Sequence, residues 1–144
     1  KPDIIDNAYV VVNFKNGVRG LLDLCMFAEN SDMQEELLAL GNKGKIETSV
    51  PSHQSGKSSS EIRIGLRKNL KTKRQIIKVD KKILNAGYHY GSTYYQHLSF
   101  IKAIKKRIKA EVSLQDGLIA VAIGEAAEKS IKEKRLVYMK EIIN

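Results

Sequence analysis

The sequence has few features that would crosslink the chain or hold it in a membrane. Its 144 residues include one cysteine, Cys25, so no internal disulfide can form and a reducing compartment such as the cytoplasm is favoured. No apolar run approaches the roughly 20 residues that span a bilayer. The first residues show neither an initiator methionine nor a signal-peptide pattern. We therefore expect a single domain, residues 1–144, that is a fragment of a longer protein.

The sequence also lacks the common patterns of catalytic and cofactor sites. No glycine-rich phosphate loop lies between a strand and a helix, and His89 and His97, eight residues apart, do not have zinc-ligand spacing. A triad of Ser92, His97 and Asp116 has no nucleophile elbow to support it. We therefore predict no catalytic residue, no metal site and no cofactor-binding residue within this sequence.

Positive charge, by contrast, is abundant and concentrated in one segment. The net charge is +9, and residues 61–82 contain nine basic side chains against two acidic ones, an excess that attracts anions. That segment contains no aromatic residue, whereas modules that bind nucleic acid commonly place aromatic residues among the basic ones. A solvated basic hairpin is therefore favoured, and an anion- or nucleic-acid-binding module is the alternative.

Apolar segments separated by turn residues predict five or six strands in the first 80 residues. Residues 8–14 and 21–27 are expected to form one hairpin, residues 35–40 and 45–50 a second, and residues 61–66 and 75–79 a third. Residues 49–60, rich in serine and including His53, are expected to be a mobile surface loop.

Two helices and a last strand are predicted in the remaining sequence. Ser92 or Thr93 is expected to cap a helix whose apolar residues recur at helical spacing as far as Ile108. Ser113 and Asp116 have the spacing of a capping box, which predicts a second helix to about residue 131. Residues 136–139 are expected to form a short strand.

This order of elements predicts an α+β fold. We expect an open, predominantly antiparallel or mixed sheet with both helices packed on one face. Residues 9–12 and 21–27 are apolar at nearly every position, which is typical of strands buried on both sides. Because two helices can cover only one face, we expect the other face to be buried against a second copy of the chain or another domain.

Two polar segments are candidates for binding. His89 precedes the first predicted helix, where an imidazole and backbone amides can bind a polar or anionic ligand, although the same residues could merely close a loop. Residues 29–32 are all polar and connect two apolar strands, and their alternative interpretation is a solvated loop.

Four stretches, residues 6–17, 38–44, 89–104 and 112–130, carry a family resemblance through their order and spacing. Together they resemble the C-terminal domain of the glucose-fructose oxidoreductase and inositol dehydrogenase (Gfo/Idh/MocA) family. The resemblance implies a two-domain oxidoreductase in which an N-terminal Rossmann domain binds NAD or NADP. The domain described by these stretches would complete the pocket for a sugar or cyclitol and would form a homodimer or tetramer through its sheet.

The resemblance also implies which side chains contact the substrate. These are the polar residues of the two candidate segments, namely Glu29, Asn30, Ser31, Asp32, His89 and Tyr90. The family's catalytic lysine, within a Glu-Lys-Pro motif, and its Asp and His pair have no match here, so the fragment alone is expected to be inactive. The alternative is a non-enzymatic assembly or regulatory domain that keeps the sheet and has lost the pocket.

Overall fold

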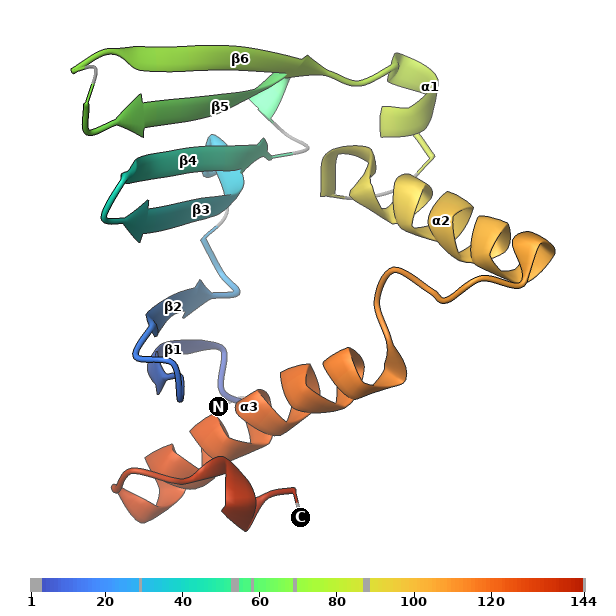
Figure 1. The fold of residues 1–144 in the computed structure, drawn as a ribbon. Helices are drawn as coiled ribbons and strands as arrows, with labels where there is room; N and C mark the ends of the chain where they lie inside the picture. Colours follow the sequence, from blue (N-terminus) through green and yellow to red (C-terminus); the bar gives the residue numbers. More distant parts are fainter. Residues whose placement is uncertain are drawn as a thin grey trace. The chain divides into compact units, whose positions relative to one another are not determined.

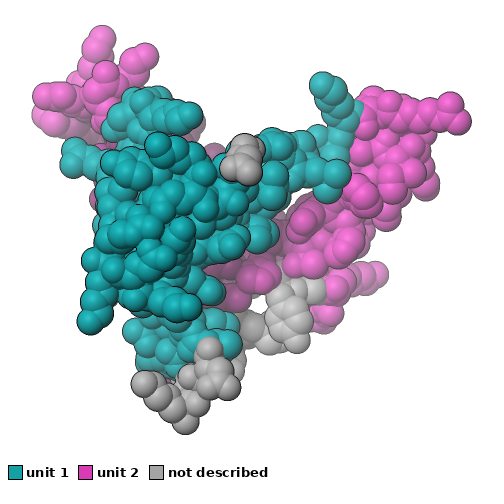
Figure 2. All heavy atoms as spheres, turned by 90° about the horizontal axis from the view of Figure 1, so that it is seen from below, with its two compact units in different colours: residues 1–28, 109–144 teal, residues 29–108 magenta. Residues whose placement is uncertain are grey.

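The computed structural model describes residues 4–28, 30–52, 55–57, 59–68, 70–86 and 89–143. The chain divides into two compact units (Figure 2). Unit 1 consists of Lys1–Ala28 together with Lys109–Asn144, and unit 2 consists of Glu29–Ile108.

The predicted α+β class with an open, predominantly antiparallel sheet is confirmed, with the strands divided between two such sheets. The six strands divide between a two-stranded sheet in unit 1 and a four-stranded sheet in unit 2, and every strand pairing among the described residues is antiparallel. Each unit also contains one long helix. No helix of the described residues is long and apolar enough to cross a membrane.

Unit 1 begins with the hairpin of β1 (Asn7–Asn13) and β2 (Arg19–Cys25), drawn in blue in Figure 1. The turn lies where the sequence predicts it: Asn16 Oδ1 accepts a hydrogen bond from the Val18 N–H at 3.1 Å, and Gly17 has a φ of 84°. A positive φ of this size is easily adopted only by glycine. Local turn chemistry therefore sets the pairing of the two strands.

The long helix of unit 1 is α3 (Leu114–Glu133), and it begins at the predicted capping box. The Asp116 N–H donates to Ser113 Oγ at 3.2 Å, and the Ser113 N–H donates to Asp116 Oδ2 at 2.8 Å. The hydrogen bonds from Ser113 lower the pKa of the Asp116 carboxyl. Ala122 and Ala126, one helical turn apart, are buried, so the small residues of this helix provide its packing face.

The predicted last strand at residues 136–139 is wrong. The segment instead turns into the short helix η3 (Met139–Glu141). Glu141 causes the turn: its Oε1 accepts from the Tyr138 N–H at 2.8 Å, and its two oxygens accept from Arg135 at 3.1 and 2.6 Å. These bonds, chiefly those from Arg135, lower the pKa of the Glu141 carboxyl to about 2. The β-like run of residues 136–139 is thus overridden by a local ion pair.

Unit 2 contains the four-stranded sheet in the order β3 (Met33–Gly41), β4 (Gly44–Pro51), β5 (Ser59–Leu66) and β6 (Thr72–Lys78), shown in Figure 1. Gly44 lies so close to β5 that a Cβ atom there would be 2.3 Å from the Gly65 carbonyl oxygen. The glycine is therefore required by close approach of two strands.

The serine-rich loop is shorter than predicted. Residues 49–51 belong to β4 and residues 59–60 to β5, and the Ser60 hydroxyl donates to the carbonyl of Ser49. Pro51 is buried. Pairing with neighbouring strands therefore orders residues that their composition alone assigns to a loop. His53 lies outside the described residues.

The strand register gives the four-stranded sheet two different faces. Ala39, Ile46 and Ile64 lie opposite one another in one row, and Leu38, Glu47 and Arg63 lie in the adjacent row. Adjacent rows point to opposite faces because side chains alternate along a strand. One face is therefore mainly apolar, and the other carries charged side chains between apolar ones.

Unit 2 continues with α1 (Lys81–Leu84), η2 (His89–Gly91) and α2 (Ser92–Lys106), which follow at the end of the sheet where β6 finishes (Figure 1). The prediction that Ser92 or Thr93 caps α2 is wrong. The N-cap is Gly91, with a φ of 86°, and no side chain of the described residues caps the helix. The chain enters α2 through a left-handed turn that only glycine adopts without strain.

The described residues bury little apolar surface. The buried hydrophobic residues among them are three alanines, at positions 103, 122 and 126. Large side chains on one face of the β1–β2 hairpin are open to solvent: Tyr9, Val11 and Leu21 are 77%, 67% and 69% exposed. Their common face follows from the register, in which Val11 lies opposite Leu21.

Candidate functional site

His89 and Tyr90 lie in a strained turn directly before α2. His89, Tyr90 and Gly91 have φ angles of 55°, 54° and 86°, so three consecutive residues are left-handed. This conformation costs roughly 1–2 kcal/mol for each non-glycine residue. Strain of this kind persists only where the surroundings enforce it, and it is commonly found at functional sites.

Packing around Gly91 enforces the turn. A Cβ atom on Gly91 would lie 3.0 Å from Ile83 Cγ2 and 3.1 Å from Val79 Cγ1, so α1 and the residue after β6 close over this glycine. The η2 turn also contacts β4. The sheet and α1 together therefore fix the backbone that carries His89 and Tyr90.

The His89 side chain is held by a carboxylate that the sequence interpretation missed. His89 Nδ1 lies 2.5 Å from Glu35 Oε1, and the two side chains are 47% and 53% exposed. A polar contact this exposed stabilises a fold by only about 0.2–1 kcal/mol. Its main effect is to orient the imidazole. The sequence predicts only a strand at Glu35, because a contact between residues 54 positions apart has no local sequence signal.

Tyr90 contributes a hydroxyl with an unused hydrogen-bonding capacity. Its Oη is buried and has no hydrogen-bond partner among the described residues, while the side chain as a whole is half-buried. Burial raises the pKa of the Tyr90 hydroxyl, so it keeps its proton and can donate it to a ligand oxygen. A buried polar group without a partner is uncommon and calls for a ligand or water.

The second predicted segment is only partly available for binding. Ser31 Oγ donates to the Met33 carbonyl at 2.7 Å, and Asp32 Oδ2 accepts from Lys57 Nζ at 2.7 Å. Asn30 is exposed and left-handed, with a φ of 63°, and Glu29 lies outside the described residues. No hydrogen bond among the described residues joins this segment to His89; it leads instead into β3, the strand that carries Glu35.

The remaining polar candidates have structural roles. His97 Nδ1 lies 2.8 Å from the Thr93 carbonyl oxygen, one turn earlier in α2, and Asp116 completes the capping box of α3. Neither is arranged for nucleophilic catalysis. Across the described segments, no group of three or more histidine, cysteine, aspartate or glutamate residues could hold a metal ion.

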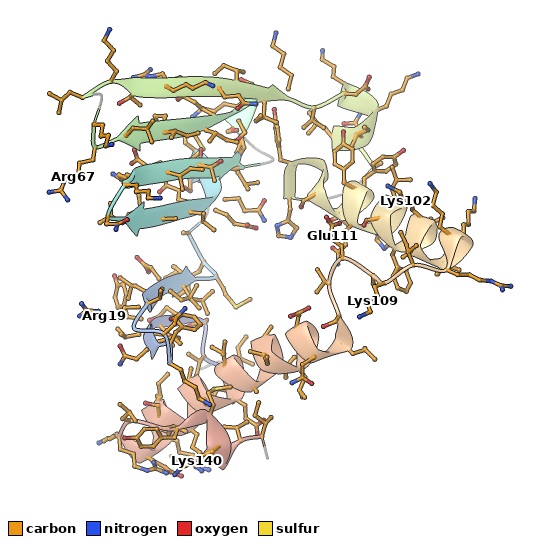
Figure 3. All side chains as sticks on the ribbon, viewed as in Figure 1. Arg19, Arg67, Lys102, Lys109, Glu111 and Lys140 are labelled. Carbon is orange, nitrogen blue, oxygen red and sulfur yellow. The ribbon has the colours of Figure 1, made fainter. Side chains whose placement is uncertain are left out.

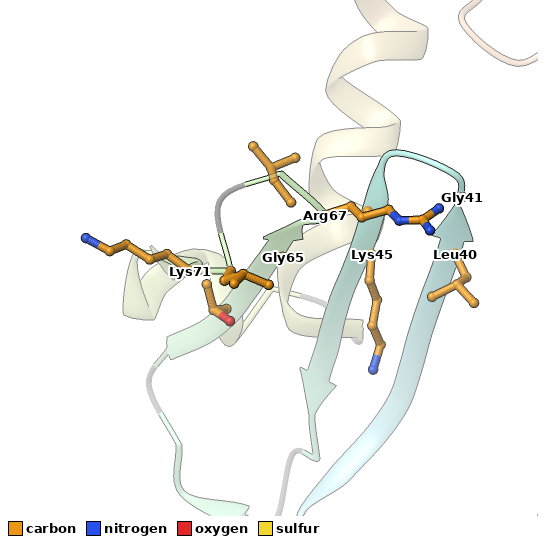
Figure 4. Close-up of a pocket in the computed structure, with 10 residues that line it drawn as sticks. Leu40, Gly41, Lys45, Gly65, Arg67 and Lys71 are labelled. Atoms are coloured by element: carbon orange, nitrogen blue, oxygen red, sulfur yellow. The ribbon is translucent and has the colours of Figure 1, made fainter.

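A hollow at the far end of the four-stranded sheet is a second possible site. It has a volume of about 360 Å³ and lies between the β3–β4 turn and the β5–β6 turn (Figure 4). Lys45 is paired with Glu47 at 2.8 Å. Lys71 points away from the hollow, and Arg67 alone extends across it towards Gly41 (Figure 4). One arginine does not form a convergent anion site.

The basic segment is the predicted hairpin, formed by β5 and β6. On it, Arg63 and Arg74 lie 3.9 and 3.6 Å from the carboxylate of Glu61. Arg67 lies at the turn of this hairpin, and Lys102 lies on α2 at the other end of unit 2 (Figure 3). The positive charge is therefore partly paired and spread over the unit, as expected for a solvated surface.

Comparison with known proteins agrees with the resemblance seen in the four stretches. A family model described as the oxidoreductase family, C-terminal alpha/beta domain (Gfo/Idh/MocA), matches residues 1–140. The chain is also similar to myo-inositol 2-dehydrogenase of Thermotoga maritima, with 29% identity over 148 residues. That alignment covers 96% of the chain and 38% of the relative, so the chain spans well under half of the relative's length.

Proposed function

Because the chain belongs to the Gfo/Idh/MocA oxidoreductase family through its C-terminal α/β domain, we propose that it is the substrate-binding and oligomerisation domain of an NAD(P)-dependent oxidoreductase. Its substrate would be a sugar or cyclitol whose hydroxyl-bearing carbon is oxidised, as the similarity to a myo-inositol dehydrogenase suggests. The observation that carries the proposal is the pairing of His89 with Glu35 in a strained turn.

The side chains of this turn suit a polyol. A hydroxyl group is both a donor and an acceptor, and a pocket that encloses it must satisfy both capacities. One nitrogen of the His89 ring is bound to Glu35, and no hydrogen bond to the other nitrogen is seen among the described residues, so that nitrogen can meet a hydroxyl. The Tyr90 hydroxyl is protonated and lacks a partner among the described residues, so it can donate to a second oxygen.

The dinucleotide is assigned to another part of the protein. The closely spaced glycines at positions 41 and 44 join β3 to β4, whereas a dinucleotide site needs a glycine-rich turn between a strand and a helix. The described residues therefore do not fit NAD or NADP, and we assign its binding to an N-terminal Rossmann domain outside this chain. With that division, this domain binds and orients the substrate.

The proposal includes assembly through a sheet face. Tyr9, Val11 and Leu21 expose most of their apolar surface on one face of the β1–β2 hairpin. Exposed apolar patches of this kind commonly mark protein interfaces. A second copy of the chain would cover them in a homodimer or tetramer. We also propose a reducing compartment such as the cytoplasm, because Cys25 is free and exposed.

The test of substrate binding is His89→Ala in the full-length protein. Loss of one hydrogen bond in a closed pocket costs about 1–3 kcal/mol, so the KM for the polyol should rise about 5- to 150-fold while the KM for the dinucleotide stays within twofold. His97→Ala is the matched control, because the contact of that ring seen among the described residues is to the Thr93 carbonyl of its own helix. Equal effects of the two substitutions would contradict the proposal.

The alternative is a non-enzymatic assembly domain. Experiments on the full-length protein distinguish this alternative from the proposed oxidoreductase domain. A full-length protein that assembles but neither binds NAD(P) nor oxidises polyols would support the alternative. Dinucleotide-dependent oxidation of a polyol by the wild-type protein would exclude it.

A further inference from the structure

We propose that Glu35 is a positioning residue that fixes which nitrogen of His89 faces the substrate. The inference rests on the proposed function, since it takes His89 as a substrate contact. Glu35 adds a residue on β3 to a site otherwise formed by the η2 turn. Its contact determines whether His89 presents a hydrogen-bond donor or an acceptor to a polyol.

The position of Glu35 is set by an irregularity in the sheet. Glu35 pairs with Val50 across the β3–β4 ladder, and the register shifts between Met33 and Glu35. A shift of this kind re-aims the side chains beside it and is common next to binding sites. Here it accompanies a carboxylate whose Oε1 lies 2.5 Å from His89 Nδ1.

The His89 end of the contact is equally constrained. The φ of 55° at His89 sets the direction of its Cα–Cβ bond, and Gly91 is packed against Ile83 and Val79. Two constraints therefore fix the imidazole: the left-handed backbone sets the direction in which the side chain leaves the chain, and the Glu35 carboxylate sets the orientation of the ring. A lone exposed histidine would have neither constraint.

The chemistry of the contact determines the tautomer. An ionised carboxylate only accepts hydrogen bonds, so the proton lies on Nδ1, which donates to Glu35. In the neutral ring, Nε2 then has a free lone pair. The site consequently presents a hydrogen-bond acceptor to the ligand from His89, complementary to the donor that Tyr90 offers. A polyol hydroxyl can satisfy the acceptor by donating its hydrogen.

The experiment uses Glu35→Gln in the full-length protein, with Glu36→Gln as the matched control. Glu36 is the next residue on β3, is exposed and projects to the opposite face of the strand. A glutamine amide can donate as well as accept, so it no longer holds the proton on Nδ1. Nitrogen NMR of 15N-histidine, with the His89 signals assigned through His89→Ala, reports the tautomer directly.

The expected result has a spectroscopic and a kinetic part. In the wild-type and Glu36→Gln proteins, neutral His89 carries its proton on Nδ1; in Glu35→Gln, Nε2 becomes protonated in a substantial fraction. The polyol KM of Glu35→Gln rises about tenfold, which corresponds to about 1.4 kcal/mol, and the dinucleotide KM is unchanged.

Two failures can be told apart. A wild-type spectrum with the proton on Nε2, or a Glu35→Gln protein that keeps both the wild-type spectrum and polyol KM, overturns the role of Glu35 even where His89→Ala weakens polyol binding. A His89→Ala protein with wild-type polyol kinetics overturns the proposed substrate contact, and the positioning role with it, whatever the tautomer.

Discussion

Replacing Leu21 by glutamate should break the proposed assembly. Leu21 lies on the exposed face of the β1–β2 hairpin, opposite Val11, and is 69% exposed in the chain alone. Full burial of a leucine side chain stabilises by about 1.5–3 kcal/mol, so covering its exposed part would contribute about 1–2 kcal/mol. A twofold interface contains the residue twice, which gives about 2–4 kcal/mol.

That free energy translates into a large change in association. Because every 1.4 kcal/mol is a factor of ten, Leu21→Glu should raise the dimer dissociation constant by about 30- to 700-fold. Desolvation of the added carboxylate would increase the effect. Sedimentation velocity of the full-length protein at micromolar concentrations should show a dimer or tetramer for the wild type and a shift towards monomer for Leu21→Glu.

The control for this prediction is Leu114→Glu. Leu114 is 95% exposed at the start of α3, so the substitution makes the same chemical change at a position outside the proposed interface, where an acidic residue suits the helix N-terminus. The assembly state should not change. A wild-type protein that sediments as a monomer, or a Leu21→Glu protein that associates like the wild type, would refute the reasoning about the exposed face.

Two further predictions concern the stability of unit 1. Ser113→Ala removes the side-chain half of the α3 capping box and should lower the free energy of unfolding by about 0.5–2 kcal/mol, measured by urea titration; an unchanged midpoint would show that the cap contributes nothing. Glu141 has a folded-state pKa of about 2, below its usual 4.5, chiefly because Arg135 donates to it. The contribution of the ionised Glu141 carboxylate to the free energy of unfolding should therefore be complete above pH 4.5 and disappear as the pH falls towards 2. Unfolding measured from pH 2 to 6 should show a shallower pH dependence for Glu141→Gln, and parallel curves would contradict the assignment.

Features fixed by neighbouring residues could be predicted from the sequence. The turn at Asn16 and Gly17 and the capping box of Ser113 and Asp116 both form where the residue types require them. Their hydrogen bonds span two or three residues, so the spacing of the side chains contains the necessary information. The order of strands and helices followed from the same kind of local pattern.

Features fixed by distant contacts or by competing local interactions could not be predicted from the sequence. Gly91 replaces a serine or threonine cap because packing by Val79 and Ile83 requires a left-handed turn. The segment before η3 has β-like composition, but the ion pair of Arg135 and Glu141 bends it. Tertiary and electrostatic contacts override intrinsic propensity in both cases.

The candidate site also combines a feature that local sequence predicts with one that depends on a distant contact. His89 was predicted as a ligand contact from its position before a helix, whereas Glu35 lies 54 residues earlier and comes to it only when the sheet forms. Asp32 remains a predicted ligand contact, and the structure adds that its Oδ2 accepts a hydrogen bond from Lys57 Nζ across the serine-rich segment. Polar residue type alone cannot distinguish a side chain that meets a ligand from one that ties two loops together.

The most direct test of the account is equilibrium binding of a polyol such as myo-inositol to the full-length protein saturated with dinucleotide. Calorimetric titration should give a dissociation constant for the polyol that is about 5- to 150-fold higher in His89→Ala than in the wild type and in His97→Ala, with dinucleotide affinity equal in all three. Polyol affinity that is the same with and without the His89 imidazole would contradict the assignment of this domain to substrate binding through the η2 turn.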